Sequence, residues 1–123
     1  MSLLDKPVSF LASCNPDQSR KFYEDVLKLK CLSVDPYALV FDCVRTTLRI
    51  QIVDNVPYVA YTVLGWEVDD IEQCVKRLSS DGVKFETFEG LVQNDLEIWS
   101  SPSGASVAWF KDPDGNILSL TQQ

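Results

Sequence analysis

The sequence predicts an α+β fold made of two similar halves, each in the order strand-helix-strand-strand-strand. Two observations support this prediction. Apolar residues recur at helical spacing around residues 22–27 and 71–78, and turn signals divide most of the remaining chain into short strand-like runs. The order of elements repeats although the residues do not, which indicates a structural repeat. With 123 residues, the chain has the size of a single domain that can bury a core of its own.

The first half begins with a strand at residues 8–12. A helix follows, in which Asn15 can cap the first turn and Pro16 suits the first helical position. One apolar stripe marks its buried face: Phe22, Tyr23, Val26 and Leu27. Three strand-like runs complete this half, at residues 31–34, 37–43 and 47–53.

The second half starts after a turn-like segment, with a strand at residues 58–67. The sequence at the start of the helix that follows resembles a capping box, with Asp69 as the cap and Glu72 reaching back to it. Its buried face is predicted to contain Ile71, Cys74, Val75 and Leu78. Asp81-Gly82 should end the helix. The remaining strand-like runs are residues 83–87, then either 95–100 or 106–110, and finally 117–120.

The stretch WFKDPDGNILSL, residues 109–120, contains a strongly specified turn between two apolar runs. Pro113 presets the backbone at the second turn position, and the carboxylate of Asp112 can accept hydrogen bonds from the backbone. Gly115 takes the last position of the turn. The turn therefore predicts a hairpin, and nothing in it alone requires a chemical role.

Composition argues against several kinds of partner. The net charge is −7 and the basic residues are scattered, so the chain has no surface that would attract the phosphate backbone of nucleic acid. The longest apolar run, residues 56–66, is too short to span a membrane, and no signal peptide is visible. The four cysteines show no metal-binding spacing, which favours reduced thiols and a cytoplasmic protein.

Three segments together carry a resemblance to a known family. They are Ser19 with Phe22-Tyr23-x-x-Val26-Leu27, then Val68-Asp69-Asp70-Ile71, and then residues 109–116 around the Asp-Pro-Asp-Gly turn. The chain resembles the vicinal oxygen chelate superfamily of glyoxalase I, extradiol dioxygenases, fosfomycin-resistance enzymes and bleomycin-resistance proteins. This resemblance implies two βαβββ modules, at about residues 7–53 and 58–121, whose curled mixed sheets form an open cup. It also implies a homodimer. One departure is Lys28, where members often have glycine.

The resemblance also locates the positions at which metal-using members place their ligands. In this chain those positions fall on Val8, on Gln51 or Arg49, on Val63 and on Ser119. The chain contains no histidine. Catalytic divalent ions need imidazole or anionic donors, which these residues do not supply. We therefore expect no metal and no cofactor.

Several polar residues near the expected cup could either contact a ligand or have no functional role. Glu67 shares a strand face with Val63 and either faces the cup or lies in solvent at the strand end. Arg49 and Gln51 either recognise a polar group of a ligand or form a solvated strand face. Ser119 can donate a hydrogen bond but has no histidine to activate it.

Aromatic residues give the stronger functional signal. Five lie on or near predicted cup strands, where some serve the core and the others are available to a ligand: Phe10, Tyr61, Trp66, Trp99 and Trp109. The segment from Phe88 to Gly104 is longer than a hairpin needs and is either a pocket lid or a wide connection.

The leading hypothesis is a metal-free binding protein similar to bleomycin-resistance proteins, which takes a small aromatic or cationic ligand in a dimer-interface cup. Its site would use nine residues: Phe10, Arg49, Gln51, Tyr61, Val63, Glu67, Trp99, Trp109 and Ser119. A glyoxalase-like lyase or dioxygenase relative with a non-standard site is the alternative. A dimeric barrel of ferredoxin-like modules explains the strand pattern but not the ordered motifs.

Overall fold

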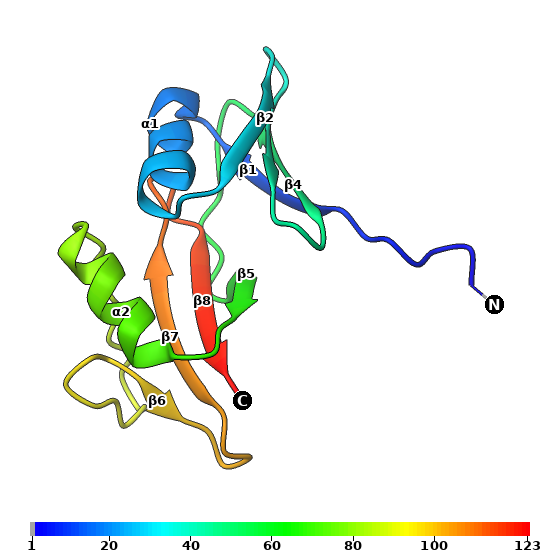
Figure 1. Ribbon diagram of the computed structural model, residues 1–123. Coiled ribbons are helices and arrows are strands. Elements are labelled where there is room, and N and C mark those ends of the chain that lie inside the picture. The colour runs from blue at the N-terminus through cyan, green and yellow to red at the C-terminus, as the bar shows by residue number, and fades with distance from the viewer. Residues whose placement is uncertain (1) are drawn as a thin grey trace. The chain divides into compact units, whose positions relative to one another are not determined.

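The computed structural model describes residues 2–123, which form two compact units, and the boundary along the chain lies between Tyr58 and Val59. Each unit contains one helical segment and one four-stranded mixed sheet (Figure 1). The predicted α+β class and the order strand-helix-strand-strand-strand are confirmed in both units. Neither sheet closes into a barrel, because each has two free edge strands in the hydrogen-bonded order of the described residues.

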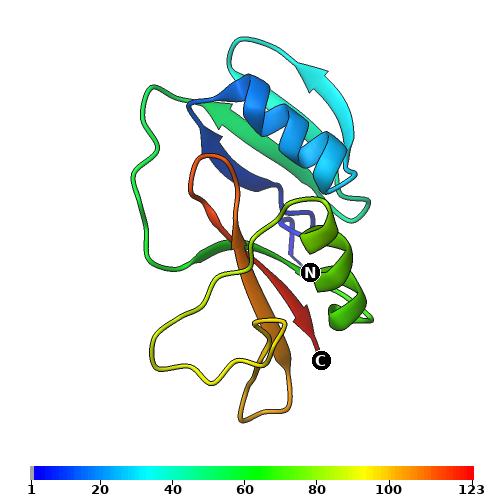
Figure 2. The same cartoon turned by 90° about the vertical axis from the view of Figure 1, so that its left-hand side faces the viewer.

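The first unit has a sheet in the order β1-β4-β3-β2, in which β1 runs parallel to β4 and the other pairs are antiparallel. Its elements are β1 (Ser9–Ser13), α1 (Pro16–Lys21), the π-helical turn η1 (Phe22–Val26), β2 (Lys30–Val34), β3 (Ala38–Asp42) and β4 (Thr47–Ile52). Figure 2 shows α1 and η1 as one continuous coil lying across one face of this sheet.

The helical segment of the first unit differs from the prediction at its start and at its end. Asn15 occupies the N-cap position, but its side chain makes no capping hydrogen bond, so that prediction was wrong. The Ser13 hydroxyl instead accepts the Asn15 N–H at 3.1 Å. At the other end the helix widens to a π turn, and Leu27 N–H donates to the Phe22 carbonyl at 3.0 Å. Lys28 leaves the helix at a φ of 62°, a conformation that glycine adopts more easily.

The second unit has a sheet in the order β5-β8-β7-β6, with β5 parallel to β8. Its elements are β5 (Thr62–Glu67), α2 (Ile71–Ser80), β6 (Trp99–Ser100), β7 (Ser106–Lys111) and β8 (Ile117–Gln122). In Figure 1, α2 lies against the strands of this sheet, and its contacts are with β7 and β8.

The predicted strand at residues 83–87 is not a strand. Only one isolated bridge forms there, between Phe85 and Phe110. On the side of β7 that faces away from β8, two segments share the strand. β6 pairs with the first residues of β7, and Phe85 pairs near its end. Both segments left open as the third run are therefore strands, with the first reduced to two residues.

The helix α2 confirms the predicted end and corrects the predicted start. Asp70, not Asp69, is the N-cap, and its carboxylate accepts the Gln73 N–H at 3.1 Å. The Gln122 side chain accepts the Ile71 N–H at 2.8 Å, a contact that the local sequence does not reveal. Asp81-Gly82 ends the helix as predicted, with Gly82 at a φ of 95°. Of the helices in residues 2–123, none has the length and apolar character that a membrane span requires.

The Asp-Pro-Asp-Gly turn joins β7 and β8 in the predicted antiparallel hairpin. The buried Asp112 carboxylate accepts the backbone N–H groups of Asp114 and Asn116, both at 2.9 Å, and the Asn116 side-chain amide at 2.8 Å. Several hydrogen bonds thus compensate the burial of this charge. The turn has a structural role.

Each sheet has a core face that packs against the helix of its own unit and an opposite face, which we call the open face. The core faces carry alternate buried residues: Leu11, Leu39, Phe41, Leu48 and Ile50 in the first sheet, and Ala108, Phe110, Leu118 and Leu120 in the second. Side chains one position away along these strands point to the open faces, and on β3 these side chains, Ala38 and Val40, are also buried. The candidate site residues are concentrated there.

Candidate functional site

Three aromatic rings gather on the open face of the second sheet. The ring centroids of Trp99 and Trp109 are 6.0 Å apart at an interplanar angle of 35°, and Phe88 meets Trp109 edge-to-face at 5.3 Å. The indole N–H of Trp109 donates to the Thr62 hydroxyl at 3.0 Å, which fixes the ring across the sheet. We call Phe88, Trp99 and Trp109 the ring cluster. Both tryptophans were predicted from the sequence, whereas Phe88 and Thr62 were not.

The loop that carries Phe88 is fixed by the side chain of Gln93. The Gln93 carbonyl accepts the Phe88 N–H at 2.8 Å, and its amide donates to the carbonyls of Glu86 at 2.9 Å and Glu97 at 2.8 Å. An ion pair of 3.6 Å between Lys111 and Glu86 ties the start of the loop to β7. These contacts fix this part of the Phe88–Gly104 segment, so the position of Phe88 in the ring cluster is defined.

Ser119 lies beside the ring cluster, because it pairs with Trp109 on one side and with Gly65 on the other. Its side chain is directed over Gly65, where an added Cβ would lie 2.4 Å from the serine Oγ. Ser119 is only 7% exposed. It fills a gap in the sheet surface, which leaves it little capacity to orient a ligand.

Glu67 and the other predicted residues of this unit have different placements. Glu67 is on the open face in the row after Gly65, and it is exposed at the end of β5. Val63 lies half-buried at a bulge in β5. Tyr61 is 64% exposed just before that strand. Trp66 pairs with buried Leu120 and belongs to the core face.

The open face of the first sheet carries the other three predicted residues. Phe10 on β1 pairs with Arg49 on β4, and Gln51 follows in the next row of the same face. All three are exposed, Phe10 by 53%. These residues are neighbours, as the sequence analysis expected of Arg49 and Gln51.

The residues at the four metal-ligand positions of the resembled family do not fit a divalent ion. Val8 and Val63 offer only hydrocarbon, and the Ser119 hydroxyl lies against Gly65. Gln51 alone has a usable oxygen, and Arg49 carries positive charge. Across residues 2–123, no group of three or more His, Cys, Asp or Glu side chains is placed to hold a metal. No catalytic step through a metal can be derived from this donor set.

A cysteine nucleophile finds no support at Cys74. This residue lies on α2, which packs on the core face of its own sheet. Burial raises the pKa of its thiol, and the nearby carboxylates of Asp70 and Asp69 add to that effect, while the Arg77 cation opposes it. The thiol is protonated at neutral pH, so it is a poor nucleophile.

A repeated βαβββ unit with an open mixed sheet, and with the motifs around Phe22 and Asp112, defines the class of protein. The chain belongs to the Glyoxalase/Bleomycin resistance protein/Dioxygenase superfamily, whose family model matches residues 7–120. The predicted membership is confirmed.

Solved structures of this superfamily share the fold. A lactoylglutathione lyase from Agrobacterium tumefaciens is 17% identical, with a TM-score of 0.75, and the match covers 98% of this chain and 95% of that one. A glyoxalase family protein from Enterococcus faecalis is 24% identical, with a TM-score of 0.73 and coverage of 98% and 99%. A superfamily member from Sphaerobacter thermophilus is 21% identical, with a TM-score of 0.74 and coverage of 98% and 100%. No curated protein matches the chain.

Proposed function

We propose that this protein is a metal-free binding protein that holds a small planar aromatic ligand, preferentially a cation, on the ring cluster of the second sheet. The observation that carries the proposal is the anchoring of Trp109. Its N–H is committed to Thr62 and its ring is flanked by Phe88 and Trp99, so the aromatic surface is held in place before a ligand arrives. Preorganisation of this kind lowers the entropic cost of binding.

The distance between the two tryptophan rings limits where a flat ligand can stack. A flat ligand between two rings needs about 7 Å between their planes, twice the carbon contact distance. The Trp99 and Trp109 centroids are only 6.0 Å apart. A ligand therefore stacks on the outer surface of the pair, where cation–π attraction contributes roughly 0.5–2 kcal/mol.

Glu67 favours a ligand that also carries a positive charge on an extended arm. It pairs with Thr121, which pairs with Val107, which in turn pairs with Trp99. Three strand spacings of about 4.8 Å separate the backbone of Glu67 from that of Trp99 by roughly 14 Å. The net charge of −7 adds a weaker, salt-sensitive attraction for cations.

Titration with matched planar probes tests the proposal. We expect the cation 9-aminoacridine to quench tryptophan fluorescence and to bind more tightly than the anion 9-anthracenecarboxylate. Trp99→Leu and Trp109→Leu should weaken binding by about 2- to 30-fold, the range that corresponds to the stacking energy. Trp66→Phe, on the core face, is the control and should leave affinity unchanged. Equal loss in all three variants, or tighter binding of the anion at the tryptophans, would contradict the proposal.

A second measurement separates this proposal from the enzyme alternative. Elemental analysis after mild purification should show far less than one equivalent of Zn, Ni, Fe or Mn per chain, because the four ligand positions offer one usable donor at most. A stoichiometric transition metal that is lost in a Gln51→Ala variant would favour an enzyme with a non-standard metal site.

A further inference from the structure

We infer that the open face of the first sheet carries a binding site for an aromatic carboxylate, formed by Arg49 with Phe10 and Gln51. This inference goes beyond the proposed function, because it concerns the other sheet and a ligand of opposite charge. It begins from the surroundings of the four arginines of the chain.

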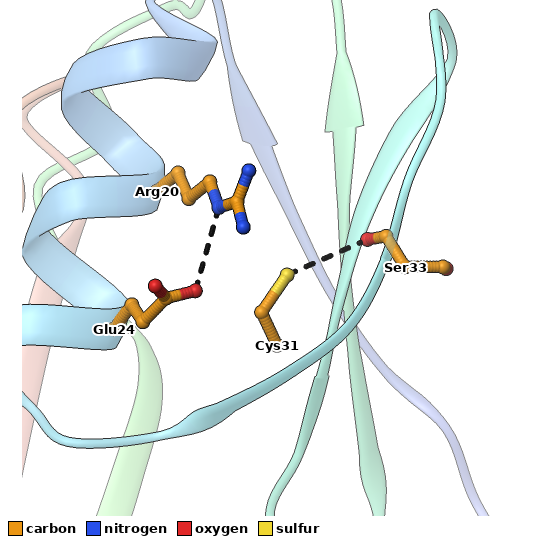
Figure 3. Close-up of polar contacts among 4 residues, drawn as sticks. All are labelled: Arg20, Glu24, Cys31 and Ser33. Carbon is orange, nitrogen blue, oxygen red and sulfur yellow. Dashed lines mark hydrogen bonds and ion pairs between the residues drawn. The ribbon is translucent and has the colours of Figure 1, made fainter.

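Two of the four arginines have carboxylate partners. Arg20 pairs with Glu24 at 3.4 Å (Figure 3), and Arg77 pairs with Asp81 at 3.8 Å. Within the described chain, no ion pair or hydrogen bond involves the Arg49 side chain. This is notable in a protein with 18 acidic and 11 basic residues, where carboxylates are plentiful.

A carboxylate in the next row of the same face is engaged in a turn. Asp42 pairs with Thr47, which lies two residues before Arg49 on β4, so Asp42 shares the open face with the arginine. Its carboxylate accepts the Val44 N–H at 2.8 Å in the turn that follows β3. The five N–H donors of the guanidinium are therefore available for an external acceptor.

The cross-strand neighbours of Arg49 are apolar, and Phe10 is the accessible one, since Val40 is buried. On the two adjacent strands, Phe10 and Val40 pair directly with Arg49. Phe10 is 53% exposed, so its ring is accessible to a ligand. Adjacent strands are about 4.8 Å apart, so a ligand whose carboxylate meets the guanidinium can lay its ring against Phe10.

Gln51 completes the site with an amide. It lies two residues after Arg49 on the same face, between Ala12 and buried Ala38, and its own side chain is exposed. No hydrogen bond joins its side chain to another residue in the range 2–123. A planar guanidinium binds a carboxylate through two parallel hydrogen bonds, and an adjacent amide can donate a third.

Benzoate, followed by NMR and calorimetry, tests this inference. We expect benzoate to shift the amide signals of Phe10, Arg49 and Gln51, and to bind at least about tenfold more tightly than the neutral isostere benzamide, because a charged pair is lost in the latter. Arg49→Gln should reduce benzoate affinity by a similar factor, and Arg49→Lys should recover only part of it, since lysine lacks the planar fork.

Arg45→Gln is the matched control. It removes the same charge from the turn between β3 and β4, away from Phe10. It should leave benzoate affinity unchanged. Equal losses in Arg45→Gln and Arg49→Gln would show a general charge effect and overturn the inference, as would equal affinity for benzoate and benzamide in the unmodified protein. The three tryptophans lie in the second unit, so failure of this test is distinguishable from failure of the fluorescence test of the ring cluster.

Discussion

Gly65 and Ser119 face each other on neighbouring strands, and only the lack of a side chain at Gly65 leaves room for the serine hydroxyl. The added Cβ of Gly65→Ala would lie 2.4 Å from Ser119 Oγ, so the serine must change its rotamer or the strands must shift. We expect the free energy of unfolding to fall by about 1–3 kcal/mol, the usual cost of overpacking. Urea denaturation measures this change.

The Ser119→Ala background provides the control for this substitution. Without the hydroxyl, Gly65→Ala should cost clearly less, and a double-mutant cycle gives the coupling between the two positions. If Gly65→Ala costs the same in both backgrounds, the close approach of Ser119 is not the reason for the glycine.

The thiol of Cys74 should be slow to alkylate. Burial raises its pKa above the usual range of a cysteine thiol, so at a pH below that pKa a smaller fraction is the reactive thiolate. Iodoacetamide labelling at pH 8, read by peptide mass spectrometry, should modify exposed Cys14 well before Cys74. Because the Arg77 cation lowers this pKa, Arg77→Gln should move the midpoint of the Cys74 rate profile to still higher pH. A midpoint unchanged by Arg77→Gln would contradict this assignment.

Among individual residues, the sequence predicted the ones whose role depends on local chemistry. Asp112 accepts backbone hydrogen bonds as its turn type demands, and Gly115 has a φ of 85°. Phe88 and Thr62 were missed because their roles depend on contacts with Trp109, at separations of 21 and 47 residues, that no local pattern encodes. The partnerless state of Arg49 likewise appears only when the surrounding carboxylates are located.

At the scale of elements, α2 begins one residue later in the structure than the sequence predicted. Asp70 caps the helix through Gln73 N–H, whereas the capping-box pattern pointed to Asp69. Both residues are exposed, so Asp69→Ala is a matched control for Asp70→Ala. We expect Asp70→Ala to lower the free energy of unfolding by about 1 kcal/mol and Asp69→Ala to have a much smaller effect. Thermal denaturation of both variants decides between the two caps, and a larger effect of Asp69→Ala would support the sequence pattern instead.

Elements with strong periodicity were predicted well, and elements fixed by distant partners were not. The buried stripe of α2 contains Ile71, Val75 and Leu78 as predicted, whereas Cys74 is only half-buried, and the hairpin of β7 and β8 forms where the turn predicted it. The segment at residues 83–87 has strand-like residues but shares the edge of β7 with β6, so only Phe85 forms a bridge. The widening of the first helix into η1 has no sequence signal that we identified.

At the scale of the whole molecule, the free edge of the first sheet bears on the oligomeric state. The strand β2 is an edge strand, and it carries exposed apolar residues, Leu32 and Val34, each 50% exposed, followed by Tyr37 at 80%. Edge strands in monomeric proteins usually carry charges that prevent pairing, and none occurs from Cys31 to Val34. A bulge between Cys31 and Ser33 limits the length of any added ladder, so side-chain burial must supply most of the association energy.

We therefore expect the chain to form a homodimer in which the β2 edges of two copies cover each other. An antiparallel pairing centred between Leu32 and Ser33 places Lys30 of each copy opposite Asp35 of the other, so charge as well as apolar area is complementary. Sedimentation at micromolar concentration should give twice the mass of one chain. Leu32→Lys should shift the equilibrium to monomer, while Val92→Lys, which changes an equally apolar and 89% exposed loop residue, should not. A dimer that persists in Leu32→Lys would place the interface elsewhere, and a monomeric unmodified protein would exclude the dimer altogether.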